Sequence, residues 1–263
     1  LLDALEKMKK NKSAGPSMVT SDLICAAGKH GLSYLFKIFC NIWETGSMPC
    51  EWLTSNTVPL YKGKGDPMDC ASYRGIRLLE HGLKIFKNIL YKRLLDHLYI
   101  GQYQYGFRSG KSTTGAIFII RQLQERFIAK NRKLYHLFID LEKAFDRVPR
   151  QAIRWALRRQ LVPEQLINLV MATYYQTSTS VITPFGCSPK FDIQVGVHQG
   201  SILSPLLFIT LVEEETKLIR SNTCFELIYV DDIVISCTSE NELREKCRIW
   251  FRELSKYGRK VNI

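Results

Sequence analysis

Residues 225–237, FELIYVDDIVISC, place two adjacent carboxylates between two short apolar segments. The segments 225–230 and 233–237 predict strands, and only Asp231 and Asp232 separate them, which predicts a tight hairpin. Such a hairpin brings both acids to one end of a sheet, where their mutual repulsion is costly unless a cation is bound. An exposed turn is the competing interpretation, because Asp is common in turns.

A third carboxylate, Asp140, ends another apolar segment, 134–139, and lies 91 residues before Asp231. If the two strands are neighbours, three acids meet at one place. An all-oxygen cluster suits Mg²⁺, and two ions about 3.5–4 Å apart would clamp the attacking and leaving oxygens of a phosphoryl displacement. The competing interpretation of Asp140 is a cap for the following turn. We expect nearby Glu142 to be solvated and Asp146 to brace the next segment.

The rest of the chain predicts an α+β fold in which an antiparallel or mixed sheet is backed by helices on one face. Ser239 and Glu242 match the capping-box pattern and predict the start of a final helix. Predicted helices in the first half break at 14–16 and 46–49. The other expected elements are a strand at 57–61, a basic loop at 62–75, helices at 85–98, 112–129, 150–160, 163–175 and 201–219, and a hairpin at 178–195.

The charge of the chain favours a polyanionic partner. The 263 residues have a net charge of +12 and are 46% hydrophobic, enough for a substantial core. Residues 1–133 hold 21 Lys and Arg against 10 Asp and Glu, whereas residues 134–263 hold 16 against 15. A region suited to gripping phosphates therefore precedes a region that can hold carboxylates. No apolar stretch approaches the roughly 20 residues of a membrane span.

The eight cysteines include no pair at zinc-ligand spacing. We interpret them as reduced thiols and expect the protein in the nucleus or cytoplasm. The chain starts without Met and stops in an apparent strand, and we expect it to be part of a longer protein.

Five segments, in order along nearly the whole chain, resemble motifs of the reverse transcriptases of non-LTR (LINE-type) retrotransposons. Two resemble the fingers motifs and three the catalytic motifs of that family. They are residues 73–79 (YRGIRLL), 106–113 (GFRSGKST), 138–146 (FIDLEKAFD), 196–208 (GVHQGSILSPLLF) and 229–232 (YVDD).

The resemblance implies a role for each matching position. Asp140, Asp231 and Asp232 match the catalytic, metal-binding aspartates. Phe145 matches the steric gate under the sugar of the incoming nucleotide, Gln199 and Gly200 match the loop beside nucleotide and template, and Lys62 and Arg74 match the pair that grips the triphosphate. Within the fingers motifs, we expect Arg77, Arg108 and Lys111 to bind nucleic acid.

Blander interpretations stay open for most of these positions. Phe145 could be a core aromatic, Gln199 and Gly200 a turn that leads into a helix, and the basic residues a solvated face. His198 is expected to be a loop residue rather than a metal ligand. Val230 stands where the family most often has Ala, and Ser17 where it usually has Asp.

The resemblance implies a right-hand polymerase with fingers over residues 1–133, including an N-terminal extension, and a palm over 134–263, the thumb being absent. It implies RNA-directed DNA polymerisation, in which dNTPs are added to a primer 3′-hydroxyl. The cofactor would be two Mg²⁺ ions, with Mn²⁺ as a substitute, and the partners an RNA template and a DNA primer. A catalytically silent nucleic-acid-binding remnant and an RNA-directed RNA polymerase are the alternatives.

Overall fold

The computed structural model describes residues 1–220 and 223–262, which form two compact units. Unit 1 comprises Leu1–His97 and Leu161–Ser204, and unit 2 comprises Leu98–Gln160 and Pro205–Ile263. Each unit therefore combines two separate stretches of the chain. The boundary expected after residue 133 falls inside unit 2, and the assignment of fingers and palm stays a prediction.

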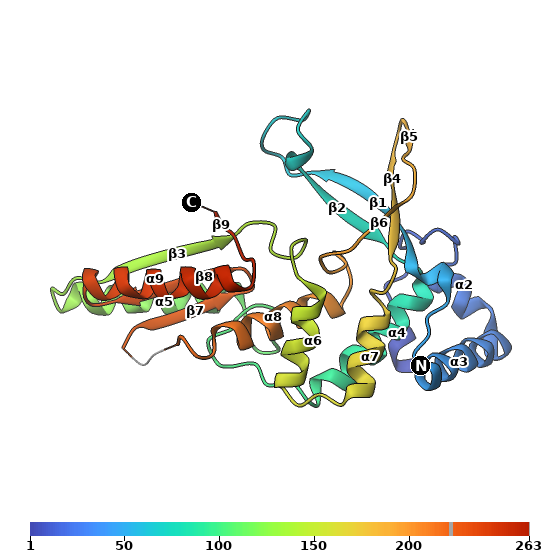
Figure 1. The fold of residues 1–263 in the computed structure, drawn as a ribbon, viewed down its shortest axis with the longest axis horizontal. Coiled ribbons are helices and arrows are strands. Elements are labelled where there is room, and N and C mark those ends of the chain that lie inside the picture. Colours follow the sequence, from blue (N-terminus) through green and yellow to red (C-terminus); the bar gives the residue numbers. More distant parts are fainter. Residues whose placement is uncertain (221–222, 263) are drawn as a thin grey trace. The chain divides into compact units, whose positions relative to one another are not determined.

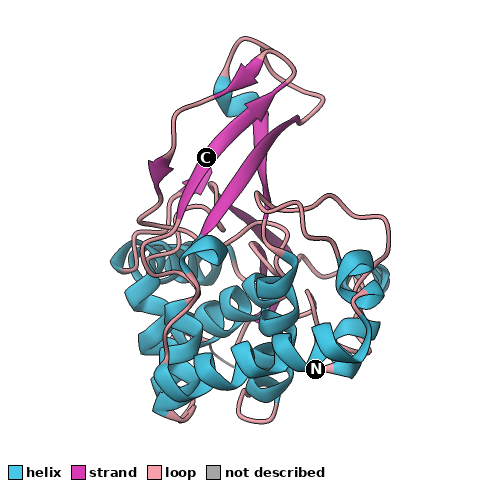
Figure 2. Cartoon of the chain, turned by 90° about the vertical axis from the view of Figure 1, so that its right-hand side faces the viewer, coloured by secondary structure: helices cyan, strands magenta, loops and turns pink. Residues whose placement is uncertain are grey.

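Unit 1 has its core around one helix, α4, whose Leu83, Ile85 and Leu90 are fully buried. The longest helix of the unit ends at Gly46, which takes a φ of 70° and donates its N–H to the carbonyl of Ile42, as a left-handed helix cap does. Figure 2 shows the helices of this unit gathered below its strands. The helices are α1 (Leu2–Glu6), α2 (Ser21–Ala26), α3 (Gly28–Thr45), α4 (His81–Leu95) and α7 (Glu164–Ala172).

The sheet of unit 1 joins strands from both of its chain segments in the order β2-β1-β4-β5, with β6 also paired to β4. The β1–β4 pair is parallel and the other pairs are antiparallel. A loop over residues 62–72 connects β1 to β2 and protrudes at the top of Figure 1. The strands are β1 (Thr54–Tyr61), β2 (Tyr73–Leu78), β4 (Ser178–Thr183), β5 (Gly186–Cys187) and β6 (Phe191–Asp192).

The sheet of unit 2 is antiparallel throughout, with the order β7-β8-β3-β9. Residues 233–237 of β8 are all buried, so both faces of this strand are covered. The predicted α+β arrangement, with an antiparallel sheet backed by helices, is confirmed. The strands are β3 (Tyr135–Leu141), β7 (Phe225–Tyr229), β8 (Asp232–Cys237) and β9 (Val261–Asn262).

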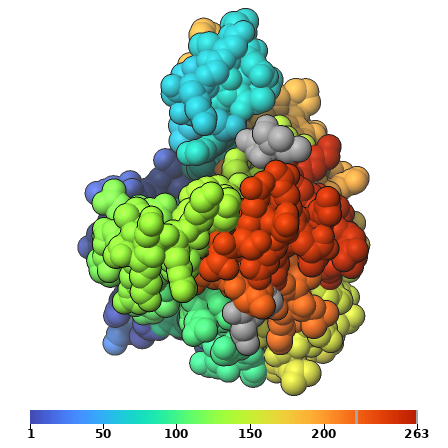
Figure 3. Space-filling model, turned by 90° about the vertical axis from the view of Figure 1, so that its left-hand side faces the viewer, coloured from blue at the N-terminus to red at the C-terminus, as the bar shows by residue number. Residues whose placement is uncertain are grey.

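Two long helices cover this sheet. α9 packs on β3 and β8 and buries Trp250 and Leu254, while α5 packs on β7. Both run along the strands in Figure 1 and reach the surface of unit 2 in Figure 3, where α5 is green and α9 red-orange. The helices here are α5 (Thr113–Ala129), α6 (Arg150–Arg159), most of α8 (Leu203–Thr216) and α9 (Glu240–Lys256).

The end of α8 carries three consecutive buried glutamates, and each has a basic partner. Glu213 pairs with Arg220 at 2.9 Å and Glu215 with Arg259 at 3.0 Å. Glu214 lies 3.7 Å from Arg159. Because unpaired buried charges are strongly destabilising, the pairs with Arg159 and Arg259 hold α8 against α6 and the segment that precedes β9.

Several expectations need correction. Asp140 lies within β3 rather than after it, and the hairpin turn is Val230-Asp231, so that Asp232 begins β8. Ser239 does precede α9, but its side chain makes no capping hydrogen bond.

The interpretation of all cysteines as thiols is also wrong. Cys224, which immediately precedes β7, and Cys237, at the end of β8, form a disulfide with their Cα atoms 4.7 Å apart. Hairpin pairing brings them together, a proximity that their separation of 13 residues does not reveal. Localisation in the nucleus or cytoplasm stays an untested prediction.

Candidate active site

Asp140 and Asp232 lie directly opposite each other in the antiparallel ladder of β3 and β8. Directly opposed residues have Cβ atoms about 4.5–5.5 Å apart and project to the same face of the sheet. β3 is an inner strand held on its other side by β9, with Asp140 opposite Asn262. The backbone of Asp140 is thus fixed from both sides, and its side chain is exposed.

The two carboxylates influence each other electrostatically. The pKa of Asp232 is raised above its ordinary value, first by burial of its carboxyl group and then by repulsion from Asp140. Since the residue as a whole is exposed, the neighbouring acid is the feature that marks a site. A cation bound beside the two carboxylates would offset their repulsion and favour the ionised form of both.

Asp231 occupies the second position of the two-residue turn between β7 and β8 and is half-buried. It immediately precedes Asp232 in the sequence. Within the described part of the chain, however, the three carboxylates do not all lie within 4.8 Å of one another. The fold therefore brings two of the three predicted metal ligands face to face and sets the third in the next turn.

The other acids near Asp140 have separate roles. Glu142 forms an ion pair with Arg147 at 3.0 Å, where the sequence suggested that it is merely solvated. Asp146 is exposed in the turn after β3, with its N–H bonded to the carbonyl of Lys143.

Phe145 lies in the same turn region and stacks on Phe208 of α8, with ring centroids 4.7 Å apart and planes inclined by 26°. Phe208 is fully buried, whereas Phe145 is half-exposed. The ring of Phe145 is therefore supported by the core and still presents part of its surface, as both a steric gate and a peripheral core aromatic would.

Lys62 and Arg74 belong to the β1–β2 hairpin of unit 1. Arg74 pairs with Leu60, two residues before Lys62, so alternation puts both basic side chains on one face of the hairpin. Both are exposed, and Lys62 Nζ donates to the carbonyl of Ala71 at 2.7 Å. Arg77, three residues after Arg74, faces the opposite side and is half-buried.

Gln199 and Gly200 lie in a turn of unit 1, and Gly200 takes a φ of +95° that favours glycine. His198, which precedes them, is held by two polar contacts. Its Nδ1 lies 2.5 Å from Nζ of the fully buried Lys87, and its carbonyl accepts from Ser204 Oγ at 2.8 Å. His198 is a buried loop residue, in agreement with the expectation that it lies in a loop.

Arg108 and Lys111, predicted to bind nucleic acid, also contact their own segment. Arg108 donates to the carbonyl of Gly101 at 2.6 Å, and Lys111 lies over the Tyr105 ring at 4.2 Å from its centroid. Both side chains are half-buried. The segment that they stabilise includes Gln104, a buried residue that no sequence motif singled out, whose Oε1 accepts a hydrogen bond from Val230 N in the turn between β7 and β8.

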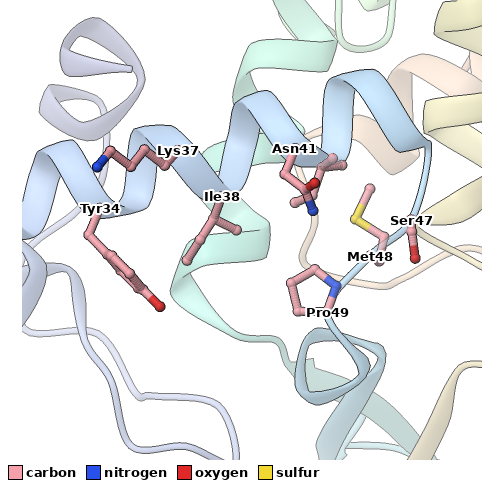
Figure 4. Close-up of a pocket in the computed structure, with 8 residues that line it drawn as sticks. Tyr34, Lys37, Ile38, Asn41, Ser47, Met48 and Pro49 are labelled. Carbon is pink, nitrogen blue, oxygen red and sulfur yellow. The ribbon is translucent and has the colours of Figure 1, made fainter.

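Figure 4 shows a pocket elsewhere, between α3 and the following turn of unit 1. None of the predicted site residues lines it. Its lining residues are Tyr34, Lys37, Ile38, Asn41, Ile42, Ser47, Met48 and Pro49.

None of the helices in residues 1–220 and 223–262 combines the length and apolar character that a membrane span requires.

Opposed aspartates at the end of an antiparallel sheet, with a third aspartate in the adjoining turn, make up an all-oxygen donor set of the class that hard divalent cations prefer. The chain belongs to the reverse transcriptase (RNA-dependent DNA polymerase) family, whose family model matches residues 62–263.

Relatives among known proteins come from mobile elements. The chain is 26% identical over 256 residues to the RNA-directed DNA polymerase from mobile element jockey of Drosophila melanogaster, which covers 91% of the chain and 27% of the relative. It is 27% identical over 243 residues to a Pol polyprotein of retrotransposable element R2 from Nasonia vitripennis, a match that covers 89% of the chain and 23% of the relative. The probable polymerase from transposon X-element of D. melanogaster is 22% identical over 271 residues, covering 99% and 30%. The chain thus spans roughly a quarter of the length of these relatives.

Proposed function

We propose that the chain carries the polymerase active site of a retroelement RNA-directed DNA polymerase, which adds dNTPs to the 3′-hydroxyl of a primer on an RNA template. The observation that carries the proposal is the opposition of Asp140 and Asp232 at the end of an antiparallel sheet, in a member of the reverse transcriptase family. The names of the relatives, RNA-directed DNA polymerases of mobile elements, agree with it.

The donor set fits divalent cations with a preference for oxygen. Repulsion between Asp140 and Asp232 contributes to the raised pKa of Asp232, and a bound cation would relieve it. Asp140 and Asp232, with Asp231 from the turn, would hold two Mg²⁺ ions or Mn²⁺ in their place. Such ions would stabilise the charge on the attacking and leaving oxygens of nucleotidyl transfer.

The remaining residues position the substrate. Lys62 and Arg74, exposed on one face of their hairpin, would neutralise the triphosphate of the incoming nucleotide. Phe145, backed by Phe208, would present a rigid apolar ring to the sugar and exclude a 2′-hydroxyl. In phosphoryl transfer this positioning and charge neutralisation account for most of the protein's contribution.

A catalytically silent nucleic-acid-binding protein is the second candidate, supported by the excess of 11 positive charges in residues 1–133. Binding of that kind weakens steeply with added salt. It needs no opposed carboxylates, which is why we prefer the enzyme.

Primer extension decides between the two candidates. The natural protein that carries these 263 residues is given an RNA template, a DNA primer, dNTPs and Mg²⁺, and Asp140→Asn is compared with Glu142→Gln, a carboxylate two residues away that is paired with Arg147. We expect extension by the wild type and by Glu142→Gln, and a loss of at least about 100-fold in Asp140→Asn. Equal extension by all three proteins would refute the site, and binding without extension by the wild type would establish the silent binder.

A further inference from the structure

Gln104 is a buried polar side chain that contacts the turn between β7 and β8, with 1% of its surface exposed. Its Oε1 accepts two backbone hydrogen bonds, from Val230 N at 3.0 Å and from Gly106 N at 2.8 Å. One amide oxygen thus joins the 101–108 segment to the residue that immediately precedes Asp231.

Val230 needs such a partner for two reasons. It is a β-branched residue with a φ of +61°, a left-handed conformation that such residues rarely adopt. It is also 5% exposed, and as the first residue of a two-residue turn its N–H points away from the β7–β8 ladder. A buried N–H is costly unless it finds an acceptor, and Gln104 supplies that acceptor.

The backbone around Gln104 is fitted to the same hairpin. Residues 103–105 run beside β7, with Tyr105 N donating to the carbonyl of Ile228 at 2.8 Å and Ile228 N donating to that of Tyr103 at 2.9 Å. A Cβ on Gly106 would lie 2.2 Å from Cγ2 of Val230, so only glycine fits against the turn. Both the side chain and the backbone of this segment therefore restrict Val230.

We propose that Gln104 is a positioning residue for the catalytic turn. Through the N–H of Val230, it holds the turn in the conformation that sets Asp231 and Asp232 toward their cations. The inference rests on the proposed function and deepens it, because it names what fixes the metal ligands before metal and nucleotide arrive. Gln104 itself touches neither.

Gln104→Met keeps the length of the side chain and removes the acceptor. Gln102→Met is the matched control, since Gln102 is exposed in the same segment. In amide hydrogen exchange we expect the Val230 N–H to exchange at least about tenfold faster in Gln104→Met than in Gln102→Met, with the amides of β8 unchanged. Gln104→Glu retains an acceptor oxygen and should restore most of the protection. Equal exchange of Val230 in all variants would overturn the hydrogen bond as a restraint.

Mn²⁺ affinity and primer extension test whether the restraint positions the ligands. We expect Gln104→Met to weaken Mn²⁺ binding about tenfold and to lower kcat by about 10–100-fold with little change in KM for dNTP, while Gln102→Met matches the wild type. Faster exchange with unaltered Mn²⁺ affinity and kcat would reduce Gln104 to a structural residue and overturn the proposal. The exchange and Mn²⁺ measurements need no polymerase activity, so an inactive wild type would count against the proposed function alone.

Discussion

Asp232 is the residue whose environment most directly reports the site, because burial and Asp140 both raise its pKa. An acid with a raised folded-state pKa contributes stability that is fully present below its unfolded pKa, about 3.9, and is lost as the pH rises through the folded value. Without divalent cations at pH 7, the ionised Asp232 therefore destabilises the fold.

Because the raised pKa makes ionised Asp232 destabilising, we predict that Asp232→Asn melts about 1–3 °C higher than the wild type at pH 7 in EDTA. The difference should shrink as the pH is lowered toward 4, since the wild-type carboxyl then takes up its proton. Thermal melts monitored by circular dichroism over this range check it. A difference that does not change with pH would mean that the Asp232 carboxyl is unperturbed.

We propose Phe145 as the residue that distinguishes a DNA polymerase from an RNA polymerase at this site. Phe145→Val removes much of the ring that stacks on Phe208 while keeping an apolar side chain. If the ring is the steric gate, incorporation of NTP relative to dNTP should rise by about 10–100-fold, because space for a 2′-hydroxyl opens. Single-nucleotide incorporation kinetics provide the measurement, and a lower melting temperature with an unchanged NTP/dNTP ratio would identify a core aromatic instead.

At the scale of elements, long periodic segments were predictable and turn details were not. The helix predicted at 112–129 is observed at Thr113–Ala129, and the strands that carry the aspartates were also identified. The turn was misplaced by one residue, because a β-branched Val230 at positive φ contradicts local preference and is maintained by a contact 126 residues away in sequence. Local sequence patterns indicate only the propensity of a segment for helix or strand. They could not predict that contact or the Cys224–Cys237 disulfide, because both join residues that are distant in the sequence.

The buried pair of Arg259 and Glu215 connects α8 to the segment that leads into β9, the neighbour of the Asp140 strand. Arg259 donates to both oxygens of Glu215, at 3.3 and 3.0 Å. Burial raises the pKa of Glu215 above its ordinary value, and Arg259 offsets only part of this effect. Removing the arginine leaves a carboxylate in the interior without its partner.

Arg259→Met is therefore expected to lower the free energy of unfolding by about 3–5 kcal/mol. Arg252→Met, at an exposed position of α9, should change it by less than about 0.5 kcal/mol. Urea titrations of the two variants and the wild type give the comparison. Equal stability of the two variants would mean that the pair contributes nothing to holding β9 in place.

At the scale of the whole molecule, sequence order and compact units do not coincide. The positive excess of residues 1–133 suggested one basic half and one nearly neutral half, yet unit 2 draws on 98–160 and 205–263 and so mixes the two. The carboxylates and the Gln104 segment share unit 2, while Lys62, Arg74, Gln199 and Gly200 belong to unit 1. Motif identity could be predicted from sequence, but the path by which the chain revisits each unit depends on long-range pairing.

The proposed polymerase site requires aspartates from two strands to share divalent cations, and a Mn²⁺ titration followed by electron paramagnetic resonance tests this most directly. We predict that the wild type and Glu142→Gln bind Mn²⁺ with the same affinity, and that Asp140→Asn and Asp232→Asn each bind it at least about tenfold more weakly. If all four proteins bind Mn²⁺ equally well, or if none binds it, the opposed carboxylates are not a metal site and the polymerase assignment of this sheet is contradicted.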